Sequence, residues 1–144
     1  MLYYALYVPA GQPPFPRGIV NEPEIRRYVE GWGQEDDKGV LALVEGKPAG
    51  AVWLRLLTGK EQGYGYVDDR TPELSIAIFP DYRGLGIGTK LIARLLEIVG
   101  TQYPQISLSV SADNPAVRLY ERVGFEKVEG TGDSLKMVKV ISDE

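Results

Sequence analysis

The sequence predicts an α/β fold in which helices flank one mixed, twisted sheet. Two segments, Glu73–Phe79 and Ile106–Ser111, alternate apolar and polar residues, the pattern of strands with one buried face. Each is followed by a segment with helical periodicity, and strand-helix-strand units favour parallel pairing. The 144 residues have the length of one domain, so we expect a single domain over residues 1–144.

The N-terminal half reads as a strand, a loop, a helix and a hairpin. Leu2–Val8 is aromatic and β-prone, and the prolines of 9–21 predict a loop. Asn21 is expected to cap a helix whose apolar residues run at helical spacing to Trp32. Two further apolar runs predict a hairpin, and a charged, glycine-rich loop follows them. These segments are Val40–Glu45 and Ala49–Leu57 around a turn at Gly46–Pro48, then the loop Thr58–Pro72 with a strand extension near Tyr64–Val67.

The C-terminal half has clearer boundaries. Apolar residues recur at helical spacing from Ile87 to the glycine at position 100, which is typical of a helix end. Asn114 followed by Pro115 is typical of a helix start. Phe125–Val128 and Leu135–Ile141 are predicted as closing strands.

Composition excludes several kinds of site. The chain has no cysteine and no histidine, which removes disulfides, Cys or Ser-His nucleophiles and imidazole or thiolate metal sites. Acid–base chemistry then falls to carboxylates, Tyr, Lys, a terminal amine or water. The net charge of −4 argues against nucleic-acid binding. No apolar run is long enough to span a membrane and the N-terminus lacks signal-peptide features, so we expect a cytoplasmic protein.

The most informative segment is a glycine-rich loop between a strand and a helix, with Arg83, Gly86 and Gly88 spaced as Arg-x-x-Gly-x-Gly. Glycines and a helix N-terminus favour contact with phosphate groups. The dinucleotide fingerprint fails because Thr89 stands where its third glycine belongs. The phosphate loop of nucleotide hydrolases fails as well, because the order here is Gly-Thr-Lys. Glycines that serve only tight packing are the competing interpretation.

Here the chain resembles the GCN5-related N-acetyltransferase (GNAT) superfamily, whose signature is this Arg-x-x-Gly-x-Gly loop. A second family feature follows at the usual spacing: Asn114, and then Leu119-Tyr120-x-x-x-Gly124-Phe125. The close match covers Glu73 to Val128. The resemblance implies a GNAT-like sheet whose two central parallel strands splay apart.

The resemblance also implies acetyl-CoA as co-substrate, with no metal. Backbone groups would bind the pyrophosphate and pair with the pantetheine arm, and Asn114 would add a contact to that arm beside its capping role. The pyrophosphate residues would be Arg83, Gly84, Leu85, Gly86, Ile87, Gly88 and Thr89, and the pantetheine residues Ala77, Ile78 and Phe79.

The catalytic residues implied are Tyr120 and Glu73. Relatives use the matching tyrosine hydroxyl to protonate the departing thiolate, and core packing is the competing role for Tyr120. Glu73 is expected to act as base or to orient a water; an exposed carboxylate at a strand end is the alternative. Ser109 stands where N-terminal acetyltransferases often carry a glutamate, which argues against peptide N-termini as acceptors. Ser107, Ser109 and Ser111 are candidates to hold a proton-relaying water.

We therefore expect transfer of an acetyl group to a primary amine of a small-molecule or peptide acceptor by direct attack in a ternary complex. Asp68 and Asp69 precede Glu73 and would form a negative mouth that attracts a cationic amine, or simply a solvated acidic loop. A catalytically inactive acyl-CoA-binding sensor and a nucleotide-binding module are the alternatives. The sequence identifies neither the acceptor nor whether the protein forms a homodimer.

Overall fold

The fold is a six-stranded sheet, seen in a computed structural model that describes residues 15–30, 32–33, 37–57, 63–131 and 134–141. The strand order is β1-β2-β3-β4-β6-β5, and every neighbouring pair is antiparallel except β3 with β4. The predicted mixed sheet is therefore confirmed. The strands are β1 (Lys38–Val44), β2 (Lys47–Arg55), β3 (Glu73–Ile78), β4 (Gln105–Ser111), β5 (Glu126–Thr131) and β6 (Ser134–Val140).

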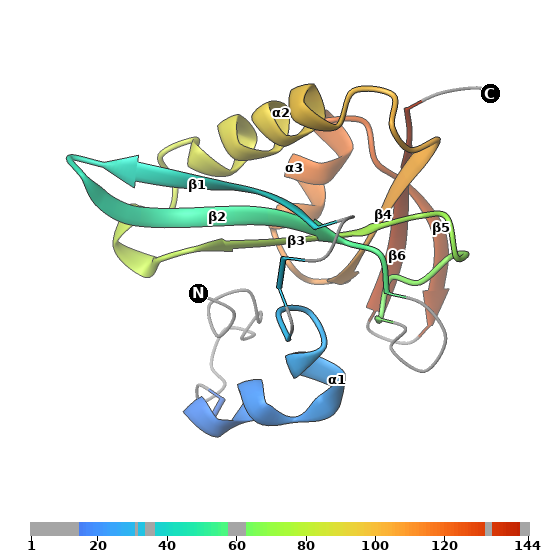
Figure 1. The fold of residues 1–144 in the computed structure, drawn as a ribbon, viewed down its shortest axis with the longest axis horizontal. Helices are drawn as coiled ribbons and strands as arrows, with labels where there is room; N and C mark the ends of the chain where they lie inside the picture. The colour runs from blue at the N-terminus through green and yellow to red at the C-terminus, as the bar shows by residue number, and fades with distance from the viewer. Residues whose placement is uncertain (1–14, 31, 34–36, 58–62, 132–133, 142–144) are drawn as a thin grey trace.

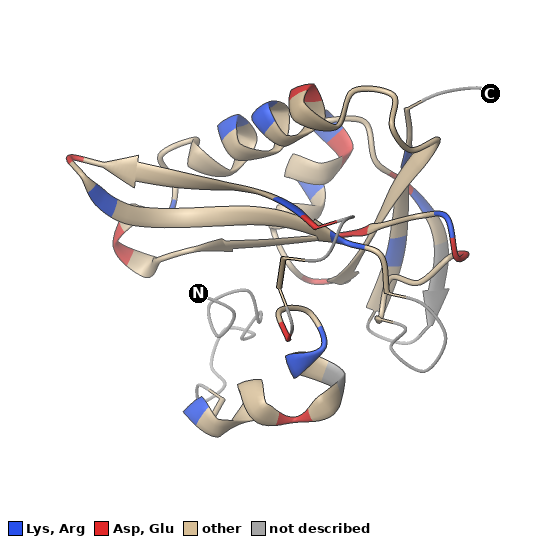
Figure 2. Ribbon diagram, in the orientation of Figure 1, with Lys and Arg blue, Asp and Glu red and all other residues tan. Residues whose placement is uncertain are grey.

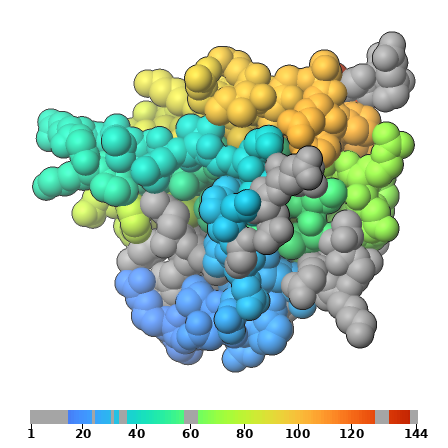
Figure 3. Space-filling view, viewed as in Figure 1, coloured from blue at the N-terminus to red at the C-terminus, as the bar shows by residue number. Residues whose placement is uncertain are grey.

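Helices lie on both faces of this sheet (Figure 1). α2 (Ile87–Val99) packs against β1, β2 and β3, and α3 (Ala116–Arg122) shares its core. On the other face lie the 3₁₀ turn η2 (Arg17–Asn21) and the short α1 (Pro23–Arg26). Figure 3 shows this N-terminal segment in blue as a separate layer beneath the sheet.

The core lies between the sheet and α2. The apolar residues of α2 repeat every three or four positions, so that one face of the helix is buried and the other is solvated. Leu91, Ile92, Leu95 and Val99 are buried on that face, against Val52, Leu74 and Leu108 of the sheet. Both of the strongest sequence predictions, β3 and α2, are confirmed.

The β1–β2 hairpin turns one or two residues earlier than predicted. Glu45 and Gly46 have φ angles of +51° and +79° and form the two-residue connection, while Lys47 and Pro48 already pair in β2. Positive φ at both central residues is the geometry whose twist matches a two-residue hairpin. The prediction of a turn at Gly46–Pro48 was wrong, because Pro48 is paired with β1 and does not belong to the turn.

The N-terminal helix is shorter than predicted. α1 has four residues, starts after an extended Glu22 whose side chain accepts no capping hydrogen bond, and is followed by turns. Asn21 belongs to η2 instead of capping α1, so that prediction was wrong: the proline at position 23 restricts the residue before it to an extended conformation. Residues 64–67 form no strand. The predicted strand Leu2–Val8 lies outside the described residues.

Within the described ranges, none of the helices combines the length and the hydropathy needed to cross a membrane.

Leu95→Ala tests whether this face of α2 anchors the fold. Leu95 is fully buried, and removing a buried leucine side chain typically costs about 2–5 kcal/mol of the free energy of unfolding. We expect a loss in that range in urea unfolding. Ile98→Ala is the matched control, because Ile98 lies on the exposed side of the same helix and should cost below about 1 kcal/mol. Equal losses in the two variants would contradict this assignment of the core.

Candidate active site

The candidate site lies where the two parallel strands separate. β3 and β4 are paired only at Glu73 and Ser107, beside a hydrogen bond of 3.0 Å from the Ser107 amide to the Pro72 carbonyl. Beyond this point β3 still pairs with β2 without a register shift up to Ile78. The edge of β3 that faces β4 is thus left without a strand partner among the described residues, and the expected splay is present.

A cavity of about 370 Å³ occupies this gap. Its walls come from the N-terminal segment, the loop before β3, the two splayed strands, α3 and β6. The cavity contains both predicted catalytic residues, Glu73 and Tyr120. Its described lining is Phe15, Ile25, Tyr28, Tyr64, Glu73, Leu74, Ser75, Ile76, Leu108, Ser109, Val110, Ser111, Asn114, Tyr120 and Ser134.

Glu73 is a buried carboxyl group at the point where the strands separate. Only 5% of the residue is exposed, and its Oε2 accepts a hydrogen bond of 2.6 Å from the Tyr28 hydroxyl. Burial raises the pKa of Glu73 to about 7, although the Tyr28 hydrogen bond, the Gly65 backbone and the charges of Lys136 and Arg27 act to lower it. A carboxyl group that titrates near neutral pH can both take and release a proton there. Because the residue is buried, Glu73 is not the exposed strand-end carboxylate of the alternative interpretation.

Two glycines of the loop before β3 pack directly on this carboxyl group. A Cβ at position 63 would lie 2.2 Å from Glu73 Oε1, and one at position 65 would lie 3.0 Å from Glu73 Cδ and 2.9 Å from the Leu108 carbonyl carbon. Real Cβ atoms do not approach other atoms this closely. The loop therefore requires glycine at both positions to cover Glu73 and reach β4.

Of the three serines of β4, one is buried and two line the cavity. Ser109 and Ser111 line the cavity, whereas Ser107 is fully buried and its hydroxyl has no hydrogen-bond partner in the described part of the chain. Glu73 Oε1 is also buried without a partner there. Glu73 and Ser107 are in register on neighbouring parallel strands, and such residues point to the same face of the sheet. The two unpartnered polar atoms therefore lie on one face of the sheet.

Tyr120 belongs to the core and also lines the cavity. It is 7% exposed, with its ring at an edge-to-face angle of 67° to Phe125. Burial raises its pKa to about 12, so the hydroxyl keeps its proton at neutral pH and can act only as a proton donor or hydrogen-bonding group.

Asn114 caps α3 and reaches the cavity at the same time. Its Oδ1 accepts a hydrogen bond of 2.9 Å from the Ala116 amide, which confirms the predicted cap. The same residue lines the cavity, so the capping role leaves room for a ligand contact.

The glycine-rich loop leads from β3 through the 3₁₀ turn η4 (Pro80–Tyr82) into α2. Gly84 and Gly86 have φ angles of +77° and +79°, and the space beside their Cα atoms is open. Gly88 instead packs close to Leu119, since a Cβ there would lie 3.2 Å from that side chain. The Arg83 Nε donates to the Ile78 carbonyl at 3.0 Å. Gly84 and Gly86 thus adopt the positive φ angles that the loop requires, while Gly88 allows α2 to approach α3.

The acidic pair before β3 does not line the cavity. One Asp68 oxygen accepts from the Arg70 amide and the Thr71 hydroxyl, both at 2.8 Å, and Asp69 accepts from the Tyr66 hydroxyl at 2.6 Å. Figure 2 shows acidic positions, in red, at the outer tip of the loop that precedes β3, and neither aspartate is among the cavity residues. The structure therefore separates Asp68 and Asp69 from Glu73 and Tyr120.

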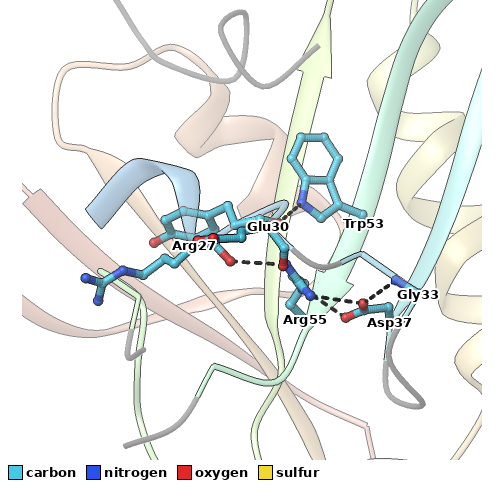
Figure 4. A network of polar contacts seen from close by, with 7 residues as sticks. Arg27, Glu30, Gly33, Asp37, Trp53 and Arg55 are labelled. Atoms are coloured by element: carbon cyan, nitrogen blue, oxygen red, sulfur yellow. Dashed lines mark hydrogen bonds and ion pairs between the residues drawn. The ribbon is translucent and has the colours of Figure 1, made fainter. Parts of the chain in front are cut away.

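A buried ion pair that the sequence reasoning missed holds the N-terminal segment against the sheet (Figure 4). Arg55 of β2 binds both oxygens of Asp37 at 3.0 and 3.2 Å and donates to the carbonyls of Arg27 and Glu30. The Trp53 indole donates to the Tyr28 carbonyl at 3.0 Å. An arginine inside an otherwise apolar strand was the available signal, because a buried guanidinium needs partners. These contacts place Tyr28 beside Glu73.

In the described ranges, acidic side chains form no group of three or more that could hold a metal ion.

The acetyltransferase (GNAT) family model matches residues 3–125. The chain belongs to this family. An uncharacterized N-acetyltransferase of Methanocaldococcus jannaschii is 32% identical over 124 residues, which cover 81% of this chain and 51% of that protein. An acetyltransferase of Sodalis glossinidius is 39% identical over 110 residues, 74% of this chain and 68% of the relative. This GNAT chain thus spans about half the length of the archaeal relative and two thirds of the bacterial one.

Among solved structures, this GNAT chain is similar to the PaiA N-acetyltransferase of Thermoplasma acidophilum in complex with coenzyme A. The TM-score is 0.59 at 20% identity, over 81% of this chain and 67% of that one. At this identity the likeness shows the fold alone, while the family model confirms the resemblance inferred from the loop and from the Asn114 to Phe125 motif.

Glu73→Gln tests the ionisation of the buried carboxyl group. The folded-state pKa of about 7 lies above the unfolded-state pKa of about 4.3, so the folded protein binds more protons between these values and its stability falls as pH rises. Glutamine does not titrate, so the stability of the variant does not fall with pH for this reason. We expect the free energy of unfolding of the variant relative to wild type to increase by about 3 kcal/mol from about pH 4 to pH 8. A pH-independent difference in urea unfolding would contradict the assignment.

Proposed function

We propose that the protein transfers an acetyl group from acetyl-CoA to a primary amine, with Glu73 and Tyr120 as the proton-transferring residues. The observation that carries this proposal is the single cavity at the splayed strands, which both residues line. Membership of the acetyltransferase (GNAT) family supports acetyl-CoA as the donor. The chemistry is direct attack in a ternary complex, because no cysteine is present to carry the acetyl group.

The donor fits the described residues in two places. Within Ala77–Phe79, the Phe79 amide donates to the Ala49 carbonyl of β2, and alternate residues of a strand turn their backbone groups to opposite edges. Ile78 therefore faces the edge that β4 leaves free; its amide is open to an extended arm, while its carbonyl accepts from Arg83. The loop Arg83–Thr89 offers backbone amides at the N-terminus of a 13-residue helix, where the helix dipole favours a pyrophosphate. The open space beside Gly84 and Gly86 supports a close approach of phosphate oxygens. Asn114 would contact the pantetheine from the opposite strand.

Glu73 would remove the proton that an amine must lose before its nitrogen can attack the thioester carbon. Its pKa of about 7 suits this role near neutral pH, since a base works best when its pKa is close to the working pH. The proton passes to the carboxylate directly or through a water, for which the unpartnered Ser107 hydroxyl is a neighbouring hydrogen-bonding group.

Tyr120 would protonate the sulfur as the carbon–sulfur bond breaks. Its position in the cavity and its raised pKa support this role, because the hydroxyl is fully protonated when the thiolate leaves. The carbon–nitrogen bond thus replaces the carbon–sulfur bond, and the products are coenzyme A and the N-acetylated amine.

The acceptor end of the cavity is lined by Phe15, Ile25, Tyr28 and Tyr64. Tyr28 and Tyr64 are stacked, with ring centroids 6.5 Å apart and planes at 14°. Aromatic faces bury apolar groups and attract cations, which supports an amine carried on an apolar or aromatic group. Asp68 and Asp69 would act only at a distance, by attracting the cationic acceptor toward the molecule.

An amine panel tests the proposed function. Acetyl-CoA is supplied with phenethylamine, hexylamine, spermidine, free amino acids and lysine or N-terminal peptides, and coenzyme A release is measured with product masses. We expect turnover with at least one amine. Saturable binding of acetyl-CoA without release for any amine would instead indicate the inactive binding domain.

Acetyl-CoA should raise the melting temperature of the protein, while ATP should not. A ligand that binds only the folded state stabilises it by about 2.7 kcal/mol at a hundredfold excess over Kd. Leu85→Glu places a carboxylate in the proposed pyrophosphate loop, on a side chain that is 63% exposed, and should reduce this shift strongly. Leu43→Glu is the control, with similar exposure on β1. Equal shifts in both variants would contradict the assignment of the loop.

Tyr120→Phe should lower kcat by about 100-fold or more, the usual contribution of a general acid. The ring and its packing on Phe125 are retained, so the melting temperature and the acetyl-CoA Kd should change little. Glu73→Gln should also lose rate near neutral pH but recover at high pH, where the amine is already deprotonated. Tyr120→Phe should not recover, because the thiolate still leaves without a proton. A full-rate Tyr120→Phe enzyme would return this tyrosine to a packing role.

A further inference from the structure

We propose that Tyr28 is a positioning residue: its hydroxyl fixes the orientation of the Glu73 carboxyl group and stabilises the carboxylate that takes up the proton of the acceptor amine. The inference rests on the proposed function, because it concerns the base of that reaction. It adds a residue from the N-terminal segment that neither the glycine loop nor the tyrosine motif contains.

The direction of the hydrogen bonds determines the state of the Tyr28 hydroxyl. The Tyr64 backbone amide donates to the Tyr28 oxygen at 2.7 Å, and an amide can only donate. The Tyr28 proton therefore points to Glu73 Oε2, at 2.6 Å. The Tyr28 hydroxyl is therefore a fixed donor to one oxygen of the Glu73 carboxyl group.

The surroundings of Oε1 also restrict the orientation of the carboxyl group. Oε1 is buried and has no hydrogen-bond partner in the described part of the chain. The nearest loop atoms leave no space for a side chain, since a Cβ on Gly63 would lie 2.2 Å from it. The carboxyl group nevertheless lines the cavity. Tyr28 on one oxygen and the glycine loop on the other thus hold the group in one orientation.

Tyr28 is itself held on both sides. Its carbonyl accepts from the Trp53 indole at 3.0 Å, and its ring stacks on Tyr64. The chain on either side of it is bound by Arg55, which donates to the carbonyls of Arg27 and Glu30 and is paired with Asp37. A hydroxyl fixed in this way does not need to reorganise during proton transfer, which is the requirement for a positioning group.

Four further polar groups lie around Glu73. Lys136 of β6 and Arg27, next to Tyr28, favour the ionised form. Arg55 is the register partner of Glu73 on β2, but it is bound to Asp37. Ser107 faces Glu73 from β4. None of these groups is altered by removal of the Tyr28 hydroxyl, so the effect of that removal reports on the Tyr28–Glu73 bond.

Tyr28→Phe tests the inference because it keeps the ring and removes the hydroxyl. Loss of a donor to the carboxylate disfavours the ionised form, so the pKa of Glu73 should rise by about one unit. The acidic limb of the pH profile of kcat/KM should move up by the same amount. The rate at pH 7 should fall about fivefold and recover by about pH 9. The pKa shift should also appear in a carbon-13 NMR titration of the Glu73 carboxyl group in the free protein.

Tyr66→Phe is the matched control. It removes a hydroxyl that also donates to a carboxylate at 2.6 Å, that of Asp69, but outside the cavity. Its pH profile should match that of wild type. A Tyr28→Phe variant with an unmoved pH profile and an unmoved Glu73 titration would overturn the inference, as would an equal loss of rate at every pH together with a lower melting temperature.

The two proposals fail in different ways. If wild type acetylates no amine, the proposed function fails, and the NMR titration still decides whether Tyr28 sets the ionisation of Glu73. If wild type is active and the titration is unaffected by Tyr28→Phe, only the positioning role fails.

Discussion

Parallel β3 and β4 are joined at one point and then diverge, and the candidate site depends on this divergence. Glu73 and Ser107 face each other at the junction, and beyond it the backbone edge of β3 has no strand partner among the described residues. Unpaired backbone groups inside a protein are costly unless another partner satisfies them. An extended ligand arm can supply that partner, so the same feature that weakens the sheet creates a binding site.

A buried carboxyl group at this junction must be held by neighbouring groups. The Tyr28 hydroxyl and the glycine loop at 63–65 do this locally, and the N-terminal segment that carries Tyr28 is bound to β2 through Arg55 and Trp53. The buried Arg55 guanidinium pairs with Asp37 through Nε and Nη2 and binds two carbonyls through Nη1, so all three of its nitrogens donate hydrogen bonds. The ion pair therefore acts on the site at a distance, through the placement of one tyrosine.

The two halves of the chain have different parts in the site. The C-terminal half, with β3, α2, β4 and α3, forms the splayed strands, the glycine loop and Tyr120. The N-terminal half forms β1 and β2, covers the face of the sheet opposite α2 with η2 and α1 (Figure 1), and adds the aromatic wall and the partner of Glu73. This division suits an enzyme family in which the donor is shared while the acceptor differs, because the wall near the acceptor can change without altering the donor side.

The sequence by itself determined the strand and helix order of the C-terminal half and the glycine loop, because these follow from periodicity and short motifs. Tyr120 and Glu73 were candidates because of the family resemblance that these motifs indicate. The sequence did not determine the short α1 or the hairpin turn, where Pro23 and the φ angles of Glu45 and Gly46 decide the local conformation. The separation of Asp68 and Asp69 from the cavity and the contact of Tyr28 with Glu73 were decided only by the tertiary structure. Residues 28 and 73 are 45 positions apart, and no local pattern encodes a hydrogen bond between segments that meet only when the N-terminal layer packs on the sheet. The raised pKa of Glu73 has the same origin, because it results from burial by groups that fold over it from other parts of the chain.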